Sequence, residues 1–116
     1  MIFAQATLGS LGSDEVRQRM VASLAELVAP GGALLVTAYG PGAREARRRW
    51  YEAQQREGLM PPFDDTKTRG GTFAFANGFV SEELSSGALA ALRPAGFSGS
   101  PVELPAGVLA CAWRRA

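Results

Sequence analysis

The 116-residue sequence contains no histidine and only one cysteine, Cys111. A disulfide within the chain and a zinc site built from cysteine and histidine are therefore both excluded. Nucleophilic catalysis by a Ser-His-Asp triad or a Cys-His pair is excluded for the same reason. Cys111 stands in an apolar run that predicts a strand, and we interpret it as a small core residue because buried thiols are usually inert.

A strong net charge is also missing. Twelve basic and eleven acidic residues leave a net charge of +1, whereas nucleic-acid-binding proteins show a clear basic excess. No apolar run reaches the roughly 20 residues that span a bilayer, and the first residues lack the basic and long apolar regions of a signal peptide. We therefore expect a cytoplasmic protein that binds neither nucleic acid nor membrane. Its 47% apolar residues are enough for the core of one domain.

The first forty residues contain a strand, helix, strand pattern. Residues 1–5 and 33–39 are apolar and predict strands that are buried in a parallel sheet. Between them, Ser13 is placed to cap a helix, and Pro30-Gly31-Gly32 is placed to end it. The apolar stripe of this helix is formed by Val16, Met20, Leu24, Leu27 and Val28.

The remaining sequence predicts two more helices and a closing pair of strands. Residues 43–57 predict the second helix, and Ser81 is expected to cap the third, with Glu82 and Glu83 in its first turn. Residues 98–104 and 108–114 predict an antiparallel hairpin.

Some side chains leave alternatives open. The second helix carries arginines that form either a phosphate-binding patch or a solvated face, and we favour the solvated face because acidic residues interleave with them. These arginines are Arg44, Arg47, Arg48 and Arg49. The segment 59–77 is long for a loop in a compact domain, and such loops are usually functional or disordered. Its Asp64 and Asp65 form a solvated turn or orient or deprotonate an acceptor, and we favour the solvated turn. We interpret Trp50 and Trp113 as core residues.

Three phrases together resemble a known family. They are LVAPGGALLV at 27–36, FVSEEL at 79–84 and LRPAGF at 92–97. In this order and spacing they are similar to the C-terminal half of class I, Rossmann-like, S-adenosylmethionine-dependent methyltransferases. The resemblance implies that residues 1–116 form a single domain, a partial methyltransferase fold that lacks the N-terminal glycine-rich cofactor-binding half. It also implies a three-layer α/β half-domain with helices on both faces of a mixed four-stranded sheet, two strands being parallel and two forming the C-terminal antiparallel hairpin.

The same resemblance implies S-adenosylmethionine-dependent methyl transfer to a small-molecule acceptor, with this chain as the acceptor-side part. Ligands of such sheets lie beyond the carboxyl ends of the strands. The residues placed beside the cofactor are Gln5, Ala6, Thr7, Leu8 and Leu11. Those placed against the acceptor are Tyr39, Phe63, Phe73 and Phe75. Loop packing is the alternative for the first group and packing at a strand end or sheet edge for the second; no catalytic residue and no metal ligand is assigned.

A second interpretation fits the same residues, namely a non-catalytic α/β module that pairs with a partner chain. Because the main cofactor motif has no counterpart here, we expect this chain alone to be inactive and to bind S-adenosylmethionine weakly or not at all. Residues 1–5 are expected to form an apolar edge strand that invites pairing with a second copy or a complementary chain.

Overall fold

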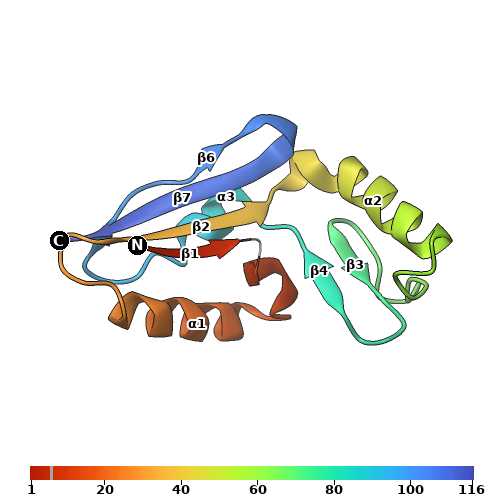
Figure 1. The fold of residues 1–116 in the computed structure, drawn as a ribbon, viewed down its shortest axis with the longest axis horizontal. Helices are drawn as coiled ribbons and strands as arrows, with labels where there is room; N and C mark the ends of the chain where they lie inside the picture. Colours follow the sequence, from red (N-terminus) through yellow and green to blue (C-terminus); the bar gives the residue numbers. More distant parts are fainter. Residues whose placement is uncertain (6) are drawn as a thin grey trace.

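The computed structural model describes residues 1–5 and 7–116 (Figure 1). The helices are α1 (Asp14–Glu26), α2 (Arg44–Arg56) and α3 (Ser86–Ala90), with three short 3₁₀ helices, η1 (Thr7–Ser10), η2 (Pro41–Ala43) and η3 (Pro105–Gly107). The strands are β1 (Ile2–Gln5), β2 (Ala33–Tyr39), β3 (Thr72–Ala74), β4 (Val80–Glu82), β5 (Phe97–Ser98), β6 (Val102–Glu103) and β7 (Val108–Arg115).

The main sheet is mixed, as predicted. β1 and β2 are parallel, and β7 lies antiparallel on the other side of β2, with Ala33 opposite Arg114 and Tyr39 opposite Val108. The sheet has five strands because β5 and β6 both pair with β7, whereas we predicted one continuous strand over 98–104. Gly99 has a φ of 133° and Pro101 has no N–H to donate, so the ladder is interrupted between the two short strands.

The third helix begins later than predicted. Ser81 does not cap it but lies buried in β4, opposite Phe73 of β3 in a separate two-stranded sheet. The cap is Ser85, whose side chain accepts a hydrogen bond of 3.0 Å from the N–H of Ala88. Pairing with β3 satisfies the backbone of this segment as a strand, so the tertiary contact overrides the local capping pattern.

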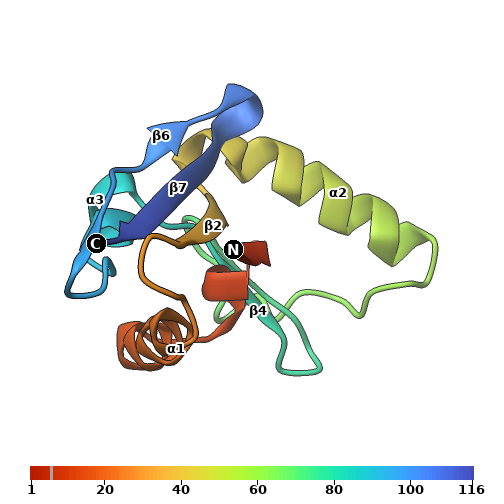
Figure 2. The same ribbon diagram turned by 60° about the vertical axis from the view of Figure 1, so that its left-hand side comes forward.

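One face of the main sheet holds the core. Its inward-facing residues are Leu34, Val36 and Ala38 of β2 and Leu109, Cys111 and Trp113 of β7. Helices α1 and α3 pack on this same face, through Val21 and Leu89 among others, and Figure 2 shows both helices on one side of the strands. Cys111 and Trp113 are thus core residues, as predicted.

The opposite face of the sheet differs from the predicted three-layer arrangement. The alternate residues Phe3, Leu35, Thr37, Ala110 and Ala112 lie on it, and every one of them is exposed or half-buried. Within the described residues, therefore, helices cover one face only, and the second helical layer that we expected is not formed.

Helix α1 is rotated relative to its predicted stripe. Val28 is buried and Met20 and Leu24 are partly buried, but Leu27 is 73% exposed. The buried line instead begins at Arg17, whose side chain donates to the carbonyl of Leu8 at 3.2 Å. The interaction holds η1 against the start of α1.

Helix α2 and the β3–β4 hairpin extend beyond the carboxyl end of β2 (Figure 1). They enclose a second core of Tyr51, Phe73 and Phe75, against which Met60 and Phe63 pack. Trp50, which we predicted to be a core residue, is 63% exposed. None of the helices in the described part of the chain has the length and apolar character needed to cross a membrane.

Candidate functional site

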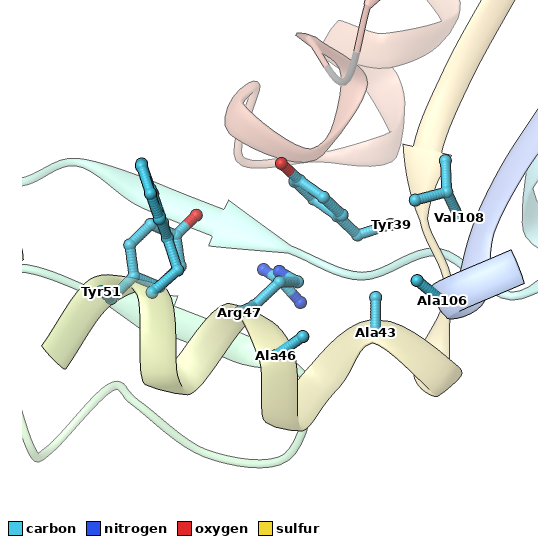
Figure 3. A pocket seen from close by; sticks show the side chains of 8 residues that line it. Tyr39, Ala43, Ala46, Arg47, Tyr51, Ala106 and Val108 are labelled. Carbon is cyan, nitrogen blue, oxygen red and sulfur yellow. The ribbon is translucent and has the colours of Figure 1, made fainter. Parts of the chain in front are cut away.

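A cavity of about 330 Å³ opens where β2 ends (Figure 3). Its walls are Tyr39, Ala43, Ala46, Arg47, Trp50, Tyr51, Ala106 and Val108. Tyr39 and Val108 face each other in the register of β2 and β7, so the last rung of the sheet forms one wall. This is the end of the strand at which α/β sheets bind ligands.

The last residue of η2 and helix α2, which continues from it, supply the opposite wall, because five of the lining residues follow helical spacing. Positions 43, 46, 47, 50 and 51 lie on one face of a helix. The side chains at 43 and 46 are alanines, which leave the space that forms the cavity. Trp50, with its large exposed ring, stands one turn further along.

Close backbone packing closes another side of the cavity. The N–H of Gly40 donates to the carbonyl of Gly107 at 2.9 Å, and η2 and η3 are in contact. A Cβ atom on Gly107 would lie 2.2 Å from the carbonyl carbon of Gly42, so no larger residue fits there. Ala106, which precedes it, lines the cavity in a left-handed conformation with φ of 67°.

Arg47 is the one charged residue among the described cavity-lining side chains, and it is only 4% exposed. Its Nη2 donates to the carbonyl and to the hydroxyl of Ser81, at 2.9 and 2.7 Å, and its Nη1 donates to the carbonyl of Gly71 at 3.1 Å. The guanidinium lies 5.0 Å from the ring centre of Tyr39 and 4.8 Å from that of Phe73. Its Nε is buried and has no hydrogen-bond partner among the described residues.

Our prediction that these arginines form a solvated face is therefore wrong for Arg47. The sequence feature that indicates the burial of Arg47 is its position, because residue 47 falls on the same helical face as Ala43 and Tyr51. A charged residue on an apolar stripe is buried when partners on another element satisfy it, here those of the β3–β4 hairpin.

Glu83 partly balances this charge. It accepts a hydrogen bond of 3.0 Å from Nε of Arg44 and a second from Nη2 of the same residue, and its Oε2 lies 4.0 Å from Nη1 of Arg47. The hydrogen bond from Arg44 lowers the pKa of Glu83, and the same contact raises the pKa of Arg44. Two guanidinium groups thus share one carboxylate, so the cluster of Arg44, Arg47 and Glu83 carries a net charge of +1.

The residues that the resemblance places beside the cofactor lie at the carboxyl end of β1. Gln5 and Thr7 are exposed, and the Thr7 hydroxyl donates to the Gln5 carbonyl at 3.1 Å. Leu8 is fully buried and Leu11 half-buried, both packing with the main core. Ala6 lies outside the described residues. The predicted role of this group in cofactor binding stays a prediction.

The predicted acceptor residues are distributed over two places. Tyr39 lines the cavity. Phe73 and Phe75 are fully buried in the second core, with Phe63 tilted against both rings at centroid distances of 5.8 and 5.2 Å. The three phenylalanines support α2 from behind, and a contact between them and an acceptor stays a prediction. Ala43, Ala46, Trp50, Ala106 and Val108 are lining residues that the sequence did not single out.

Asp64 forms a turn, which is the interpretation we favoured. Its carboxylate accepts from the backbone N–H of Thr66 at 3.1 Å and from the Thr66 hydroxyl at 2.6 Å. These hydrogen bonds lower the pKa of Asp64, with the side-chain contact contributing most, so the group is a poor base. In the described part of the chain no three His, Cys, Asp or Glu side chains are grouped to hold a metal ion.

Comparison with known proteins gives a match in structure and none in sequence. No model of a known protein family matches this chain, and no curated protein matches it. The crystal structure of a SAM-dependent methyltransferase from Methanosarcina mazei matches with a TM-score of 0.56 at 15% sequence identity. The match covers 97% of this chain and 57% of the other, so this chain spans little more than half of that protein's length. At this identity the likeness shows the fold, and it confirms the coarse prediction of a Rossmann-like, mixed α/β arrangement.

Proposed function

We propose that this chain is the acceptor-side part of an S-adenosylmethionine-dependent methyltransferase that acts on a small molecule. The observation that carries the proposal is the apolar cavity at the carboxyl end of β2, in a chain with the fold of a methyltransferase. The position agrees with the general rule for ligands of α/β sheets, and the walls have the apolar and aromatic character of small-molecule sites.

The cofactor segment and the cavity lie on the same edge of the sheet. β1 and β2 are parallel, with Gln5 opposite Thr37, so their carboxyl ends point the same way. η1 contacts β2, and in Figure 3 the hydroxyl of Tyr39 is directed toward the ribbon of η1. Tyr39 therefore stands between the segment proposed to meet the cofactor and the cavity proposed to hold the acceptor.

The residues at the end of β1 fit one end of the cofactor. Gln5 and Thr7 offer exposed polar groups, and Leu11 offers a half-buried apolar one, which suit the methionine portion. The described residues of this segment include no carboxylate to hold ribose hydroxyls, the role that an acidic residue plays in nucleotide-binding α/β folds. This chain on its own is therefore expected to bind the cofactor weakly.

When bound, S-adenosylmethionine supplies an already activated methyl group, so the protein's task is alignment and exclusion of water. Tyr39, Val108 and the alanine face of α2 would hold the acceptor flat in the cavity. Phe73 and Phe75 would keep α2 at its distance from β7 by packing against Tyr51 of the helix. None of these roles needs a histidine, in keeping with a sequence that has none.

A second candidate function is a non-catalytic module that pairs with a partner chain. The observation that favours it is the uncovered face of the main sheet, where Phe3 is 54% exposed. Its β1 edge is also unpaired within the described residues. A partner that supplies a strand and a covering layer would bury both features.

A titration of S-adenosylmethionine into the ¹⁵N-labelled chain tests the proposal. We expect weak binding that shifts the amide signals of Gln5, Thr7 and Leu11 while those of α1 beyond its first turn stay in place. Thr7→Val should reduce these shifts, and Thr66→Val, on an unrelated turn, should leave them unchanged. Shifts that appear elsewhere in the chain at high S-adenosylmethionine concentration, with none around residues 5–11, would contradict the cofactor assignment and favour the non-catalytic module.

A further inference from the structure

The cavity combines three properties that together restrict what it can hold. Apart from Arg47, its walls are aromatic rings or small apolar side chains, with Tyr39, Trp50 and Tyr51 as the large rings. A net positive charge lies behind it, because Arg44 and Arg47 share the single carboxylate of Glu83. Its described lining residues include no carboxylate or histidine able to take a proton.

We propose that the cavity binds a planar phenol-type acceptor and holds it as the phenolate, opposite the net positive charge of the Arg44–Arg47–Glu83 cluster. This inference rests on the proposed function and names the acceptor class of that same site. The proposed acceptor class consists of ring compounds with an acidic hydroxyl. Aliphatic alcohols and sugars are excluded as acceptors, because their hydroxyls need a base to react.

The dimensions suit one substituted ring. An engineered cavity of about 150 Å³ lined by apolar side chains accommodates benzene, and this cavity is about 330 Å³. A single ring with substituents, or two small fused rings, fills it. Aromatic walls favour a flat partner over a branched aliphatic one, since offset-stacked and edge-to-face arrangements add to the burial of apolar area.

Part of the charge of the cluster is held away from water, because Arg47 is buried although the Arg44 side chain is 40% exposed. Arg47 is 4% exposed and its guanidinium is flanked by the rings of Tyr39 and Phe73. A positive charge in such surroundings favours the ionised form of a nearby acidic group, and the effect is stronger than at the protein surface. The unpartnered Nε of Arg47 shows that the donors of this guanidinium are not all satisfied.

Other charged groups lie near this cluster. Glu45 acts on Arg44, whose pKa it helps to raise, and so offsets part of the positive charge. Arg48, whose guanidinium lies 5.2 Å from the ring centre of Phe73, adds positive charge. Glu103 lies against Gly42 near the start of α2, but it is not part of the cavity wall.

Ionisation in the cavity would remove the need for a catalytic base. The phenol gives its proton to water as it binds, so the oxygen already carries the electron pair that attacks. In the transfer, the bond that forms joins this oxygen to the methyl carbon. The bond that breaks joins that carbon to the sulfonium sulfur, which keeps the electron pair and becomes a neutral thioether.

The proposal is tested with 4-nitrophenol, whose phenolate absorbs visible light where the phenol does not and whose pKa lies near neutrality. We expect the pKa of the ligand bound to the whole chain to be lower by about one unit, equivalent to about tenfold tighter binding of the phenolate than of the phenol. Nitrobenzene, which has nearly the same shape and no ionisable group, should bind at least tenfold more weakly than the phenolate. Equal affinity for the two compounds would overturn the proposal.

Two pairs of variants locate the effect. Arg44→Gln leaves Glu83 to neutralise Arg47, so it should return the pKa of bound 4-nitrophenol to its value in water. Arg49→Gln is an equal charge change on the exposed side of α2 and should leave the lowered pKa of the ligand in place.

Ala46→Phe fills the cavity from an exposed helical position and should abolish binding, whereas Ala22→Phe on α1 should leave binding unchanged. Retained binding in Ala46→Phe, or equal pKa values in the two arginine variants, would overturn the assignment. The cofactor plays no part in these measurements, so their outcome is independent of the S-adenosylmethionine titration.

Discussion

Arg47 joins the two cores of the molecule. From α2 it reaches the carbonyl of Gly71 and both oxygens of Ser81 on the β3–β4 hairpin, and its guanidinium lies against Tyr39 at the end of the main sheet. Three elements are thereby fixed around one cation. The same charge faces Glu83, so Arg47 contributes both to the shape of the cavity and to its potential.

Replacement of Arg47 should destabilise the fold. Arg47→Met keeps much of the side-chain volume but leaves the carbonyls of Gly71 and Ser81 without a donor and Glu83 with one cation fewer. We expect the free energy of unfolding to fall by about 3 kcal/mol, measured by urea denaturation. Arg49→Met, at an exposed position of the same helix, should change it by less than about 0.5 kcal/mol. Equal effects of the two substitutions would mean that the contacts of Arg47 contribute no net stability.

Single residues also show the limits of reading a sequence. The burial of Cys111 and Trp113 was predictable because both stand in an apolar run. The exposure of Trp50 was not, because its ring lies on the side of α2 that faces the cavity, and an open cavity leaves no trace in local composition. The burial of Arg47 depends on partners 24 and 34 residues away in the chain.

At the scale of elements, α2 is held to the end of β4 by ionic contacts. Arg44 in the first turn of the helix binds Glu83, the residue that follows β4. Arg47, one turn later, approaches the same carboxylate. The helix would otherwise contact the rest of the chain mainly through the aromatic core around Tyr51.

This contact should make stability depend on pH. The pKa of Glu83 is lowered from its ordinary value of 4.5, chiefly by the hydrogen bond from Arg44. A carboxylate with a lowered pKa in the folded state stabilises above its unfolded pKa, and the contribution is lost as the pH falls through the folded pKa. The difference in unfolding free energy between the wild type and Glu83→Gln should therefore be constant near neutrality and shrink below about pH 4.5.

Glu52→Gln, which alters an exposed carboxylate on α2, is the matched control. Its difference from the wild type should stay small across the same pH range in chemical denaturation. A Glu83 difference that does not change on acidification would contradict the ionic attachment of α2 to β4.

The elements that the sequence predicted correctly are those that local chemistry determines. β1, α1 and β2 follow from apolar runs, a serine cap and the Pro-Gly-Gly turn, and β7 follows from an apolar run after a tight turn. The third helix was misplaced because Ser81 and Ser85 offer the same capping chemistry, and only the pairing of β4 with β3 decides between them. Helix α1 was placed correctly but rotated, since the contact of Arg17 with η1 is not visible in a hydrophobic pattern.

At the scale of the whole molecule, apolar area is unevenly covered. α1 and α3 cover one face of the main sheet, while the other face and the β1 edge have no cover among the described residues. An uncovered edge strand next to an exposed apolar side chain favours association between chains. The apolar run of β2 predicted cover on both faces, but Leu35 and Thr37 on its second face are only half-buried.

We expect the isolated chain to associate as its concentration rises. Phe3→Lys places a charge on the open face and should reduce association measured by light scattering. Leu27→Lys, which replaces another exposed apolar residue at the end of α1, should leave it unchanged. A chain that stays monomeric at high concentration, with the amide of Phe3 protected from hydrogen exchange, would show that this edge needs no partner.

The central claim is that a cofactor segment at the end of β1 and an acceptor cavity at the end of β2 adjoin one another. The most direct test is an interligand nuclear Overhauser measurement on the chain with S-adenosylmethionine and 4-nitrophenol present together at high concentration. The account predicts transfer of magnetisation between the S-methyl protons and the ring protons of 4-nitrophenol, and its loss in Ala46→Phe. Binding of both compounds with no transfer between them would contradict the assignment of this cavity to a methyl acceptor.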